Sequence, residues 1–288
     1  MKEDFTDFIE LSGLLEYNPD TISKIYQKNP KRLLNRLWQT LIPIFVYIFC
    51  VGWDKLTGRL KLESHARFRA KQLTNLLVEL GPAFVKAGQA LSTRPDIVPV
   101  ILLEELSELQ DQLPGFDGDK AMELIEEDLQ SKIEDIFFSI DKNPISAASL
   151  GQVHKAILKN KEIVAVKVQR PGLREQITLD LYIVRNIAYW LKNNIGLIRS
   201  DLVALIDELG KRVFEEMDYL NEAENANKFR NMHKHNKKIA VPKIYKEITS
   251  RRVLTMEWID GTKLTNLEDV KKLGIDPDKM IDIGFSAV

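Results

Sequence analysis

The sequence predicts an α+β fold, in which a helical extension precedes a small antiparallel sheet and its long helix. Residues 62–142 place apolar side chains at helical spacing, whereas residues 143–169 contain alternating apolar runs separated by turns. A long amphipathic segment then covers residues 201–229, and further apolar runs lead to Gly261. We place the domain boundaries at 1–61, 62–142, 143–261 and 262–288.

Composition excludes several classes of protein. The chain has 288 residues, of which 44% are hydrophobic and 29% charged, so it is long enough to bury a sizeable core. Its net charge of -1 gives no general attraction to nucleic acid, and no nucleic-acid partner is expected. The single cysteine, Cys50, excludes a disulfide framework. The four histidines show no ligand spacing, and no metal site is predicted.

The N-terminal region contains one apolar segment, Leu41–Trp53, that carries no charge and is flanked by lysines and arginines. A spanning helix needs about 20 apolar residues, and this segment also contains Pro43 and Gly52. We therefore predict peripheral contact with a membrane surface, with the aromatic side chains at headgroup level. The alternative is a helix buried beneath the following domain.

The helical extension holds an unusual stretch, FVKAGQALSTRPDIVP. Lys86 and Gln89 are three residues apart and hence share a helix face, and the small residues between and beside them allow another segment to approach closely. The pattern alone favours a solvated Lys86. Two further amphipathic helices are predicted after it, in ILLEELSELQDQLP and from about 120 to 129.

Residues 145–169 read as a strand, a tight turn of small residues, a second strand, a KNKE turn and a third strand. The order partly matches the protein-kinase nucleotide signature, GxGxxGxV followed by VAIK, with small residues where glycines are usual. The matching positions are Ser146, Ala148, Gly151 and Val153, then Val164, Ala165, Val166 and Lys167. A lysine in an apolar strand needs an anionic partner, and nucleotide phosphates would supply one. The alternative is an edge strand whose lysine lies in water.

Later segments extend this match. Residues 201–229 are predicted as one long helix, and a glutamate on such a helix holds the strand lysine in kinases. Glu216 and Glu222 would lie on different sides of that helix and therefore address different partners. Residues 241–261 are predicted to form two strands and a turn at Gly261. In kinase order MEWIDG is the hinge, with Met256 behind the adenine and the backbone of Glu257 and Ile259 bonding the base.

Taken together, FVKAGQALSTRPDIVP, SAASLGQVHKA, VAVKVQRPG and EEMDYLNEAENANKF resemble the UbiB/AarF family of atypical protein-kinase-like proteins. The resemblance implies a kinase-like N-lobe, with Glu222 holding Lys167 as the catalytic pair. It implies that the Lys86–Gln89 element folds over the nucleotide site and meets Glu216 and Asp218. The nucleotide-binding residues that follow from the match are Ser146, Ala147, Ala148, Ser149, Gly151, Val153, Ala165, Lys167, Met256, Glu257 and Ile259.

The same resemblance implies function. Members are associated with ubiquinone, plastoquinone and other isoprenoid lipids, and with ATP binding or hydrolysis at a membrane. We therefore expect ATP or ADP and a membrane or isoprenoid lipid as partners. The first 60 residues look most like cyanobacterial or plastid members, which implies peripheral attachment on the cytoplasmic side of a thylakoid or plasma membrane.

One departure from the family concerns the end of the sequence, DIGFSAV. Family members continue into a helical lobe that bears the catalytic aspartate and the metal ligands. We therefore expect a truncated C-lobe, Mg²⁺ binding only with that lobe, and no phosphotransfer by this chain alone. A separate polypeptide that supplies the lobe would restore activity. The alternatives are a non-catalytic lipid-binding or regulatory module and an inactive gene fragment.

Overall fold

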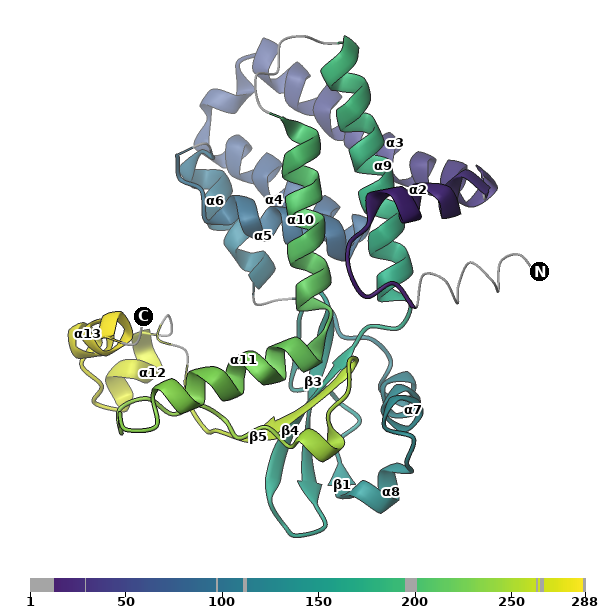
Figure 1. Cartoon of the computed structure of the whole chain (residues 1–288). Helices are drawn as coiled ribbons and strands as arrows, with labels where there is room; N and C mark the ends of the chain where they lie inside the picture. The colour runs from purple at the N-terminus through teal and green to yellow at the C-terminus, as the bar shows by residue number, and fades with distance from the viewer. Residues whose placement is uncertain are drawn as a thin grey trace. The chain divides into compact units, whose positions relative to one another are not determined.

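The computed structural model describes residues 13–28, 30–96, 98–110, 113–194, 201–262, 264 and 267–286 (Figure 1). The ends of two predicted domains, residues 1–12 and 287–288, lie outside the described residues, as does Ile97 of the RPDIVP stretch. The chain divides into two compact units, which are taken one at a time. Unit 1 comprises residues 1–117, 146–152 and 169–217, and unit 2 comprises 118–145, 153–168 and 218–288.

Unit 1 is helical. Its elements are α2 (Pro19–Lys28), α3 (Pro30–Leu56), η1 (Arg59–Lys61), α4 (Glu63–Leu80), α5 (Pro82–Ser92), α6 (Val100–Ser107), η2 (Glu108–Gln110), α9 (Leu173–Asn194) and α10 (Leu202–Glu216), together with the short strand β2 (Ser146–Ala147). The helices α9 and α10 pack against each other (Figure 1). Apolar faces of α2, α9 and α10 form the main core, in which Ile177 and Met217 are fully buried. A smaller core lies between α4, α5 and α6.

Helix α3 contains the predicted apolar segment Leu41–Trp53. The helix is 27 residues long and continues through Pro43. Among the described helices it is the one that is long and apolar enough to cross a membrane, by length and composition only. One side of α3 is nevertheless packed against its own unit. Thr40 and Asp54 are buried on that side, and the Tyr47 hydroxyl donates to the Arg69 carbonyl at 3.2 Å.

Asp54 anchors the end of α3 to α4. Its carboxylate accepts from Arg69 Nε at 2.5 Å and lies 2.9 Å from His65 Nε2. The Arg69 guanidinium and, after it, His65 hold the pKa of Asp54 below its ordinary value. Because a buried carboxylate needs charged or hydrogen-bonding partners, this cluster fixes the register of α3 on α4.

Unit 2 carries most of the sheet. Its elements are α7 (Gly118–Leu129), α8 (Ile133–Ile136), β1 (Phe137–Ile140), most of β3 (Gly151–Leu158) and β4 (Ile163–Gln169), α11 (Tyr219–Met232), η3 (Lys246–Ile248), β5 (Val253–Glu257), α12 (Leu267–Lys272) and α13 (Pro277–Ser286). The strand order is β1-β3-β4-β5, and β2 also pairs with β3. The pairs β1–β3 and β4–β5 are antiparallel. The expected mixture of helices and antiparallel strands is confirmed.

Three local predictions were wrong. Residues 137–140, placed in the helical extension, form strand β1. Between 241 and 261 only β5 is a strand, and Ile244 contributes a single bridge to Met256. Residues 201–229 do not form one helix. The chain leaves the helical conformation at Asp218, with φ -103° and ψ 98°, so α10 and α11 are separate.

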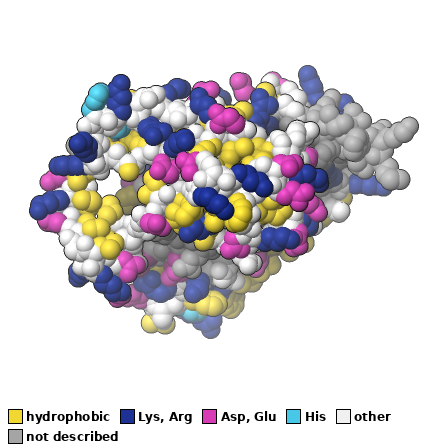
Figure 2. All heavy atoms as spheres, turned by 90° about the horizontal axis from the view of Figure 1, so that it is seen from below, with side chains coloured by type: hydrophobic (Ala, Val, Ile, Leu, Met, Phe, Trp, Pro, Cys, Tyr) yellow, Lys and Arg dark blue, Asp and Glu magenta, His cyan; other side chains and the backbone are white. Residues whose placement is uncertain are grey.

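Figure 2 shows one face of the molecule, on which lysines, arginines and acidic residues intermingle with hydrophobic side chains. Such mixing on this face agrees with a net charge of -1.

Candidate functional site

The candidate site is built on one face of the β4–β5 pair in unit 2. Lys167 lies opposite Leu254, and Ala165 lies opposite Met256. Because side chains alternate along a strand and opposite residues share a face, these four side chains lie on the same face of the sheet. Helix α11 covers that face, since its residues Tyr219 and Ala223 share a core with Leu254 and Met256.

Lys167 is held by a glutamate from α11. Its Nζ lies 2.8 Å from Oε1 and 2.7 Å from Oε2 of Glu222, and 4.6 Å from the centroid of the Tyr219 ring. Strand β4 lies between β3 and β5, so the alternative of an edge strand is wrong. The Lys167 side chain is 24% exposed and that of Glu222 41% exposed. The pair is therefore ordered by protein contacts and still open to a ligand.

The break between α10 and α11 places Glu222. The Asp218 carboxylate accepts from the backbone N–H of Leu220 at 3.0 Å, which makes it the N-cap of α11. Glu222 then lies in the first turn, where the helix dipole favours a negative charge. The expectation that Glu216 and Glu222 address different partners holds, although they lie on two helices rather than on two sides of one.

Lys86 and Gln89 lie in unit 1, on α5. The Lys86 ammonium pairs with the Glu216 carboxylate, and the Lys86 side chain is only 19% exposed, so the solvated lysine that the pattern favoured is wrong. Gln89 donates from Nε2 to the Leu109 carbonyl at 2.8 Å. A Cβ on Gly88 would come within 2.6 Å of the Leu109 side chain, which explains the small residue. That this element folds over a nucleotide stays a prediction.

The Lys86 element was also expected to meet Asp218. The Asp218 carboxylate instead caps α11 and lies 3.7 Å from Arg251 Nε within unit 2. The pairing of Asp218 with Glu216 came from the family resemblance. Asp218 is an N-cap of a helix. The sequence alone does not distinguish an aspartate that caps a helix from one that pairs with a lysine.

The predicted phosphate loop, residues 146–151, belongs to unit 1. Ser146 and Ala147 form β2, and the Ala148 N–H donates to the Gly151 carbonyl at 2.8 Å. Ser149 and Leu150 are buried. None of these residues has a positive φ, so the turn closes without the left-handed conformation that glycine favours. Val153, the next predicted residue, is half-buried on β3 in unit 2.

The hinge residues follow β5. Met256 is half-buried against the core beneath α11. The Glu257 N–H donates to the Lys243 carbonyl at 2.8 Å, and the Trp258 N–H donates to the Ile163 carbonyl at 3.2 Å. Because the Glu257 N–H is already bonded, the backbone of Glu257 can only accept a hydrogen bond from a base, through its carbonyl oxygen. The sequence-based prediction named the Glu257 backbone but did not say whether it would donate or accept.

Comparison with known proteins decides the family. Residues 108–288 match the ABC1 atypical kinase-like domain. The chain belongs to this family. The name of one relative agrees with the predicted AarF resemblance, because an aarF domain-containing protein kinase of Arabidopsis thaliana, chloroplastic, is 46% identical over 91% of this chain and 37% of its own length.

Three further proteins are similar to this chain. The Synechocystis protein sll0005 is 49% identical over 93% of this chain and 39% of its own length. The chloroplastic ACTIVITY OF BC1 COMPLEX KINASE 3 of Arabidopsis thaliana is 40% identical over 93% of this chain and 38% of its own length. The chain therefore spans about two fifths of these relatives. A solved structure, the complex of Rv3197 with erythromycin from Mycobacterium tuberculosis, is 31% identical over 74% of this chain and 52% of that chain, with a TM-score of 0.48.

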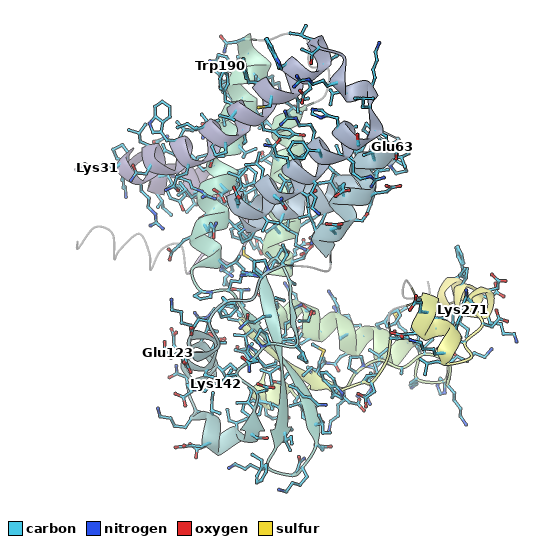
Figure 3. The ribbon with its side chains drawn as sticks, turned by 180° about the vertical axis from the view of Figure 1, so that it is seen from behind. Lys31, Glu63, Glu123, Lys142, Trp190 and Lys271 are labelled. Atoms are coloured by element: carbon cyan, nitrogen blue, oxygen red, sulfur yellow. The ribbon has the colours of Figure 1, made fainter. Side chains whose placement is uncertain are left out.

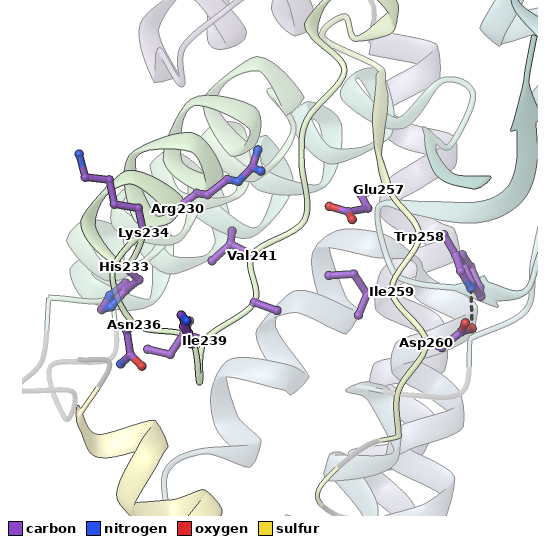
Figure 4. Close-up of a pocket in the computed structure, with 12 residues that line it drawn as sticks. Arg230, His233, Lys234, Asn236, Ile239, Val241, Glu257, Trp258, Ile259 and Asp260 are labelled. Atoms are coloured by element: carbon purple, nitrogen blue, oxygen red, sulfur yellow. Dashed lines mark hydrogen bonds between the residues drawn. The ribbon is translucent and has the colours of Figure 1, made fainter. Parts of the chain in front are cut away.

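The ABC1 chain also has a pocket of about 630 Å³ beside the hinge (Figure 4). Its lining combines basic side chains from the end of α11 and the following loop with hinge residues. These are Arg230, His233, Lys234, Asn236, Lys237, Ile239, Ala240, Val241, Glu257, Trp258, Ile259 and Asp260. Figure 4 shows Arg230 and Glu257 extending toward each other across this space, while Trp258 points away and donates to Asp260. Lys167 does not line this pocket. The candidate site is therefore defined by the Lys167–Glu222 ion pair and not by the pocket.

The sequence reading missed two features of the site. The ring of Tyr219 lies beneath the Lys167 ammonium. The one feature of the sequence that could have indicated this position is the aspartate directly before it, because Asp218 is the N-cap of α11. Lys234 and Lys237, which lie in the loop after α11, line the pocket. Within the described ranges, no group of three His, Cys, Asp or Glu side chains is arranged to hold a metal ion.

Proposed function

We propose that this chain binds an adenine nucleotide, ATP or ADP, on the β4–β5 face. Lys167 would contact the α- and β-phosphates, Ala165 and Met256 would contact the adenine, and the Glu257 carbonyl and Ile259 N–H would bond its edge. The observation that carries the proposal is the Lys167–Glu222 pair. A lysine ammonium directed by a carboxylate and an aromatic ring is in one place before any ligand arrives.

The chemistry follows from charge. A nucleotide supplies the phosphoryl group and its negative charge, and the chain supplies a fixed cation. Glu222 keeps Lys167 extended toward one position and prevents it from folding back into water. Transfer of phosphate to an acceptor, or ATP hydrolysis, is the activity that we propose for the whole protein. The chain spans about two fifths of the length of these relatives. The expectation of a truncated C-lobe and an inactive isolated chain stays a prediction.

Calorimetric titration of the 288-residue chain with ATP and ADP tests the proposal. We expect saturable binding that Lys167→Ala weakens about tenfold or more, because a phosphate contact is lost. The matched control is Lys142→Ala, since Lys142 pairs with Asp119 on the surface of the same unit, where the side chains are 67% and 70% exposed. An unchanged affinity in Lys167→Ala, or an equal loss in both variants, would contradict the proposal.

A second proposal concerns α3. We infer that its exposed face contacts a membrane surface, consistent with an ATP-linked role in quinone or isoprenoid-lipid metabolism. Nine large apolar side chains on this helix are more than half exposed: Leu34, Trp38, Ile42, Phe45, Val46, Ile48, Phe49, Trp53 and Leu56. With about 100° per residue they occupy an arc of about 160°, and the buried Thr40 and Asp54 lie opposite that arc.

This distribution supports peripheral insertion. A spanning helix would need lipid or protein against every side, whereas α3 is packed on one side and apolar on the other. Basic residues flank it: Lys31 lies at its beginning (Figure 3) and Lys55 in its last turn. Such residues attract anionic lipid headgroups.

Flotation with vesicles that contain anionic lipid tests the second proposal. We expect the chain to float, and Phe45→Ser with Phe49→Ser to reduce the bound fraction severalfold, because each lost aromatic ring removes buried apolar area. Phe138→Ser is the control, since Phe138 is equally exposed but lies on β1. Equal flotation of all three proteins would contradict membrane contact through α3. Extraction by detergent alone, and not by carbonate, would indicate a spanning helix instead.

A further inference from the structure

Arg170 joins three backbone segments of unit 1. It follows directly after β4, and its guanidinium donates to the Ala148 carbonyl from Nε at 3.2 Å and from Nη2 at 3.0 Å. Nη2 also donates to the Pro114 carbonyl at 2.6 Å, and the guanidinium carbon lies 5.9 Å from the centroid of the Phe116 ring. We propose that Arg170 is a positioning residue for the phosphate loop, residues 146–151. This inference deepens the proposed nucleotide binding and rests on it.

The contact determines which way one peptide group points. In a trans peptide the carbonyl of one residue and the N–H of the next point in opposite directions, and the described chain has no cis peptide bond. By holding the Ala148 carbonyl, Arg170 also directs the Ser149 N–H to the opposite side. A flip of this peptide would break both hydrogen bonds to Arg170. Since backbone N–H groups are what a loop offers to phosphate, their direction decides whether the loop can bind it.

Other contacts fix the same loop from its far end. The Arg170 backbone N–H donates to the Leu150 carbonyl at 2.9 Å, and the Leu150 side chain is buried in the main core of unit 1. Gln152 is fully buried and accepts from the Phe116 N–H at 2.8 Å. Residues 114–116 and the end of β4 therefore restrain the loop on both sides.

These contacts change the explanation for a loop of alanine and serine. No residue from 146 to 151 has a positive φ, so the cost of positive φ without glycine does not restrain this loop. The guanidinium supplies the restraint instead. An arginine suits this role better than a lysine, because its planar fork holds two carbonyl oxygens in a fixed geometry, whereas the donors of a lysine ammonium rotate freely.

Hydrogen exchange and nucleotide affinity, measured on the 288-residue chain, test the inference. We expect Arg170→Ala to raise the exchange rates of amides 147–151 about tenfold or more while the chain stays folded by circular dichroism. It should weaken ATP binding about tenfold and change adenosine binding less than twofold, because the loop contacts phosphate only. Arg170→Lys should fall between the two. Arg212→Ala is the control, since the Arg212 side chain is 72% exposed and pairs with Glu208 on the surface of α10.

The outcomes separate the inference from the proposal on which it rests. Unchanged exchange of the loop in Arg170→Ala would overturn the positioning role, whether or not the chain binds nucleotide. Equal losses of ATP and adenosine affinity would also overturn it, because they would indicate general damage to the fold. Faster loop exchange in a chain whose wild type binds no nucleotide would contradict the proposed function and support the restraint by Arg170.

Discussion

Lys167 and Glu222 are 55 positions apart in the chain, yet the lysine Nζ contacts both oxygens of the glutamate at 2.7 and 2.8 Å. The contact joins the central strand β4 to the first turn of α11. It orders a cation on the sheet face that also carries Ala165 and Met256. The pair holds a positive charge in a fixed place, which is the arrangement that the proposed nucleotide site requires.

Removal of Glu222 should affect binding more than stability. The pair is partly exposed, so its loss should cost only about 0.2–1 kcal/mol of folding free energy, less than a deeply buried pair would. Glu222→Gln, which keeps the shape but not the charge, should weaken ATP binding severalfold, and Glu222→Lys more strongly because like charges repel. Calorimetry and urea denaturation on the same samples check both parts. A large loss of stability with unchanged affinity would contradict the account.

The Lys86–Glu216 pair of unit 1 predicts a coupled change in stability. Removing either partner leaves the other charge without its ion pair, so Lys86→Ala and Glu216→Gln should each lower the free energy of unfolding by about 0.2–1 kcal/mol, measured by urea denaturation. The double variant should add little, because each single change already removes the contact. Independent, additive effects in the cycle would show that the pair does not act as a unit.

Because Asp218 caps the helix that carries Glu222, loss of the cap should affect nucleotide binding as well as stability. Asp218→Ala should cost about 1 kcal/mol of stability, the usual value for an N-cap, and should weaken nucleotide binding because Glu222 lies one turn away. Asp201→Ala removes the corresponding cap of α10, where the carboxylate accepts from the Ala204 N–H at 3.2 Å. This control should lose similar stability and keep its affinity. Equal affinities in the two variants would refute the link.

The lowered pKa of Asp54 predicts how the free energy of unfolding changes at acidic pH. Its pKa is lowered in the folded chain by Arg69 and His65, so its stabilising contribution is fully present above its ordinary value of 3.8. That contribution is lost as the pH falls through the lower, folded pKa. Asp54→Asn should therefore be less stable than wild type at pH 7, and the difference should narrow below about pH 4. Urea denaturation at several pH values measures this.

The control for this prediction is Asp96→Asn. The pKa of Asp96 is also lowered, by Arg94, but both side chains are 56% exposed. Solvent screens such a pair, so its substitution should change stability little at any pH. A difference between wild type and Asp54→Asn that stays constant from pH 7 to pH 3 would mean that the Asp54 charge contributes nothing.

Sequence reasoning placed strand β4 better than it placed the helices around it. Strand β4 was predicted with its bounds at 163–169, because IVAVKVQ is apolar and follows a charged turn. The α10–α11 break was missed because EEMDYLNEAENANKF continues the helical pattern without glycine or proline, and an internal aspartate cap has no periodic signal. Pairing of Lys167 with Glu222 followed from family resemblance, since no local pattern reports a contact 55 positions apart.

The other errors have similar causes. Strand β1 is only four residues long and directly follows the single turn α8, so its alternation is too short to read. Pro43 argues against a long helix because proline usually ends one, yet α3 continues through it. The packing of Asp54 and Tyr47 on α4 supplies stabilisation that propensity alone does not predict.

Covalent labelling of Lys167 tests the central claim most directly. An adenosine analogue with a sulfonyl fluoride at its 5′ position reacts with a lysine that lies where the phosphates bind. The account predicts one major adduct, located at Lys167 by mass spectrometry, that excess ATP suppresses and that Glu222→Gln reduces. Adducts spread over surface lysines, or an adduct at Lys167 that ATP does not suppress, would contradict the assignment of a nucleotide site to this face.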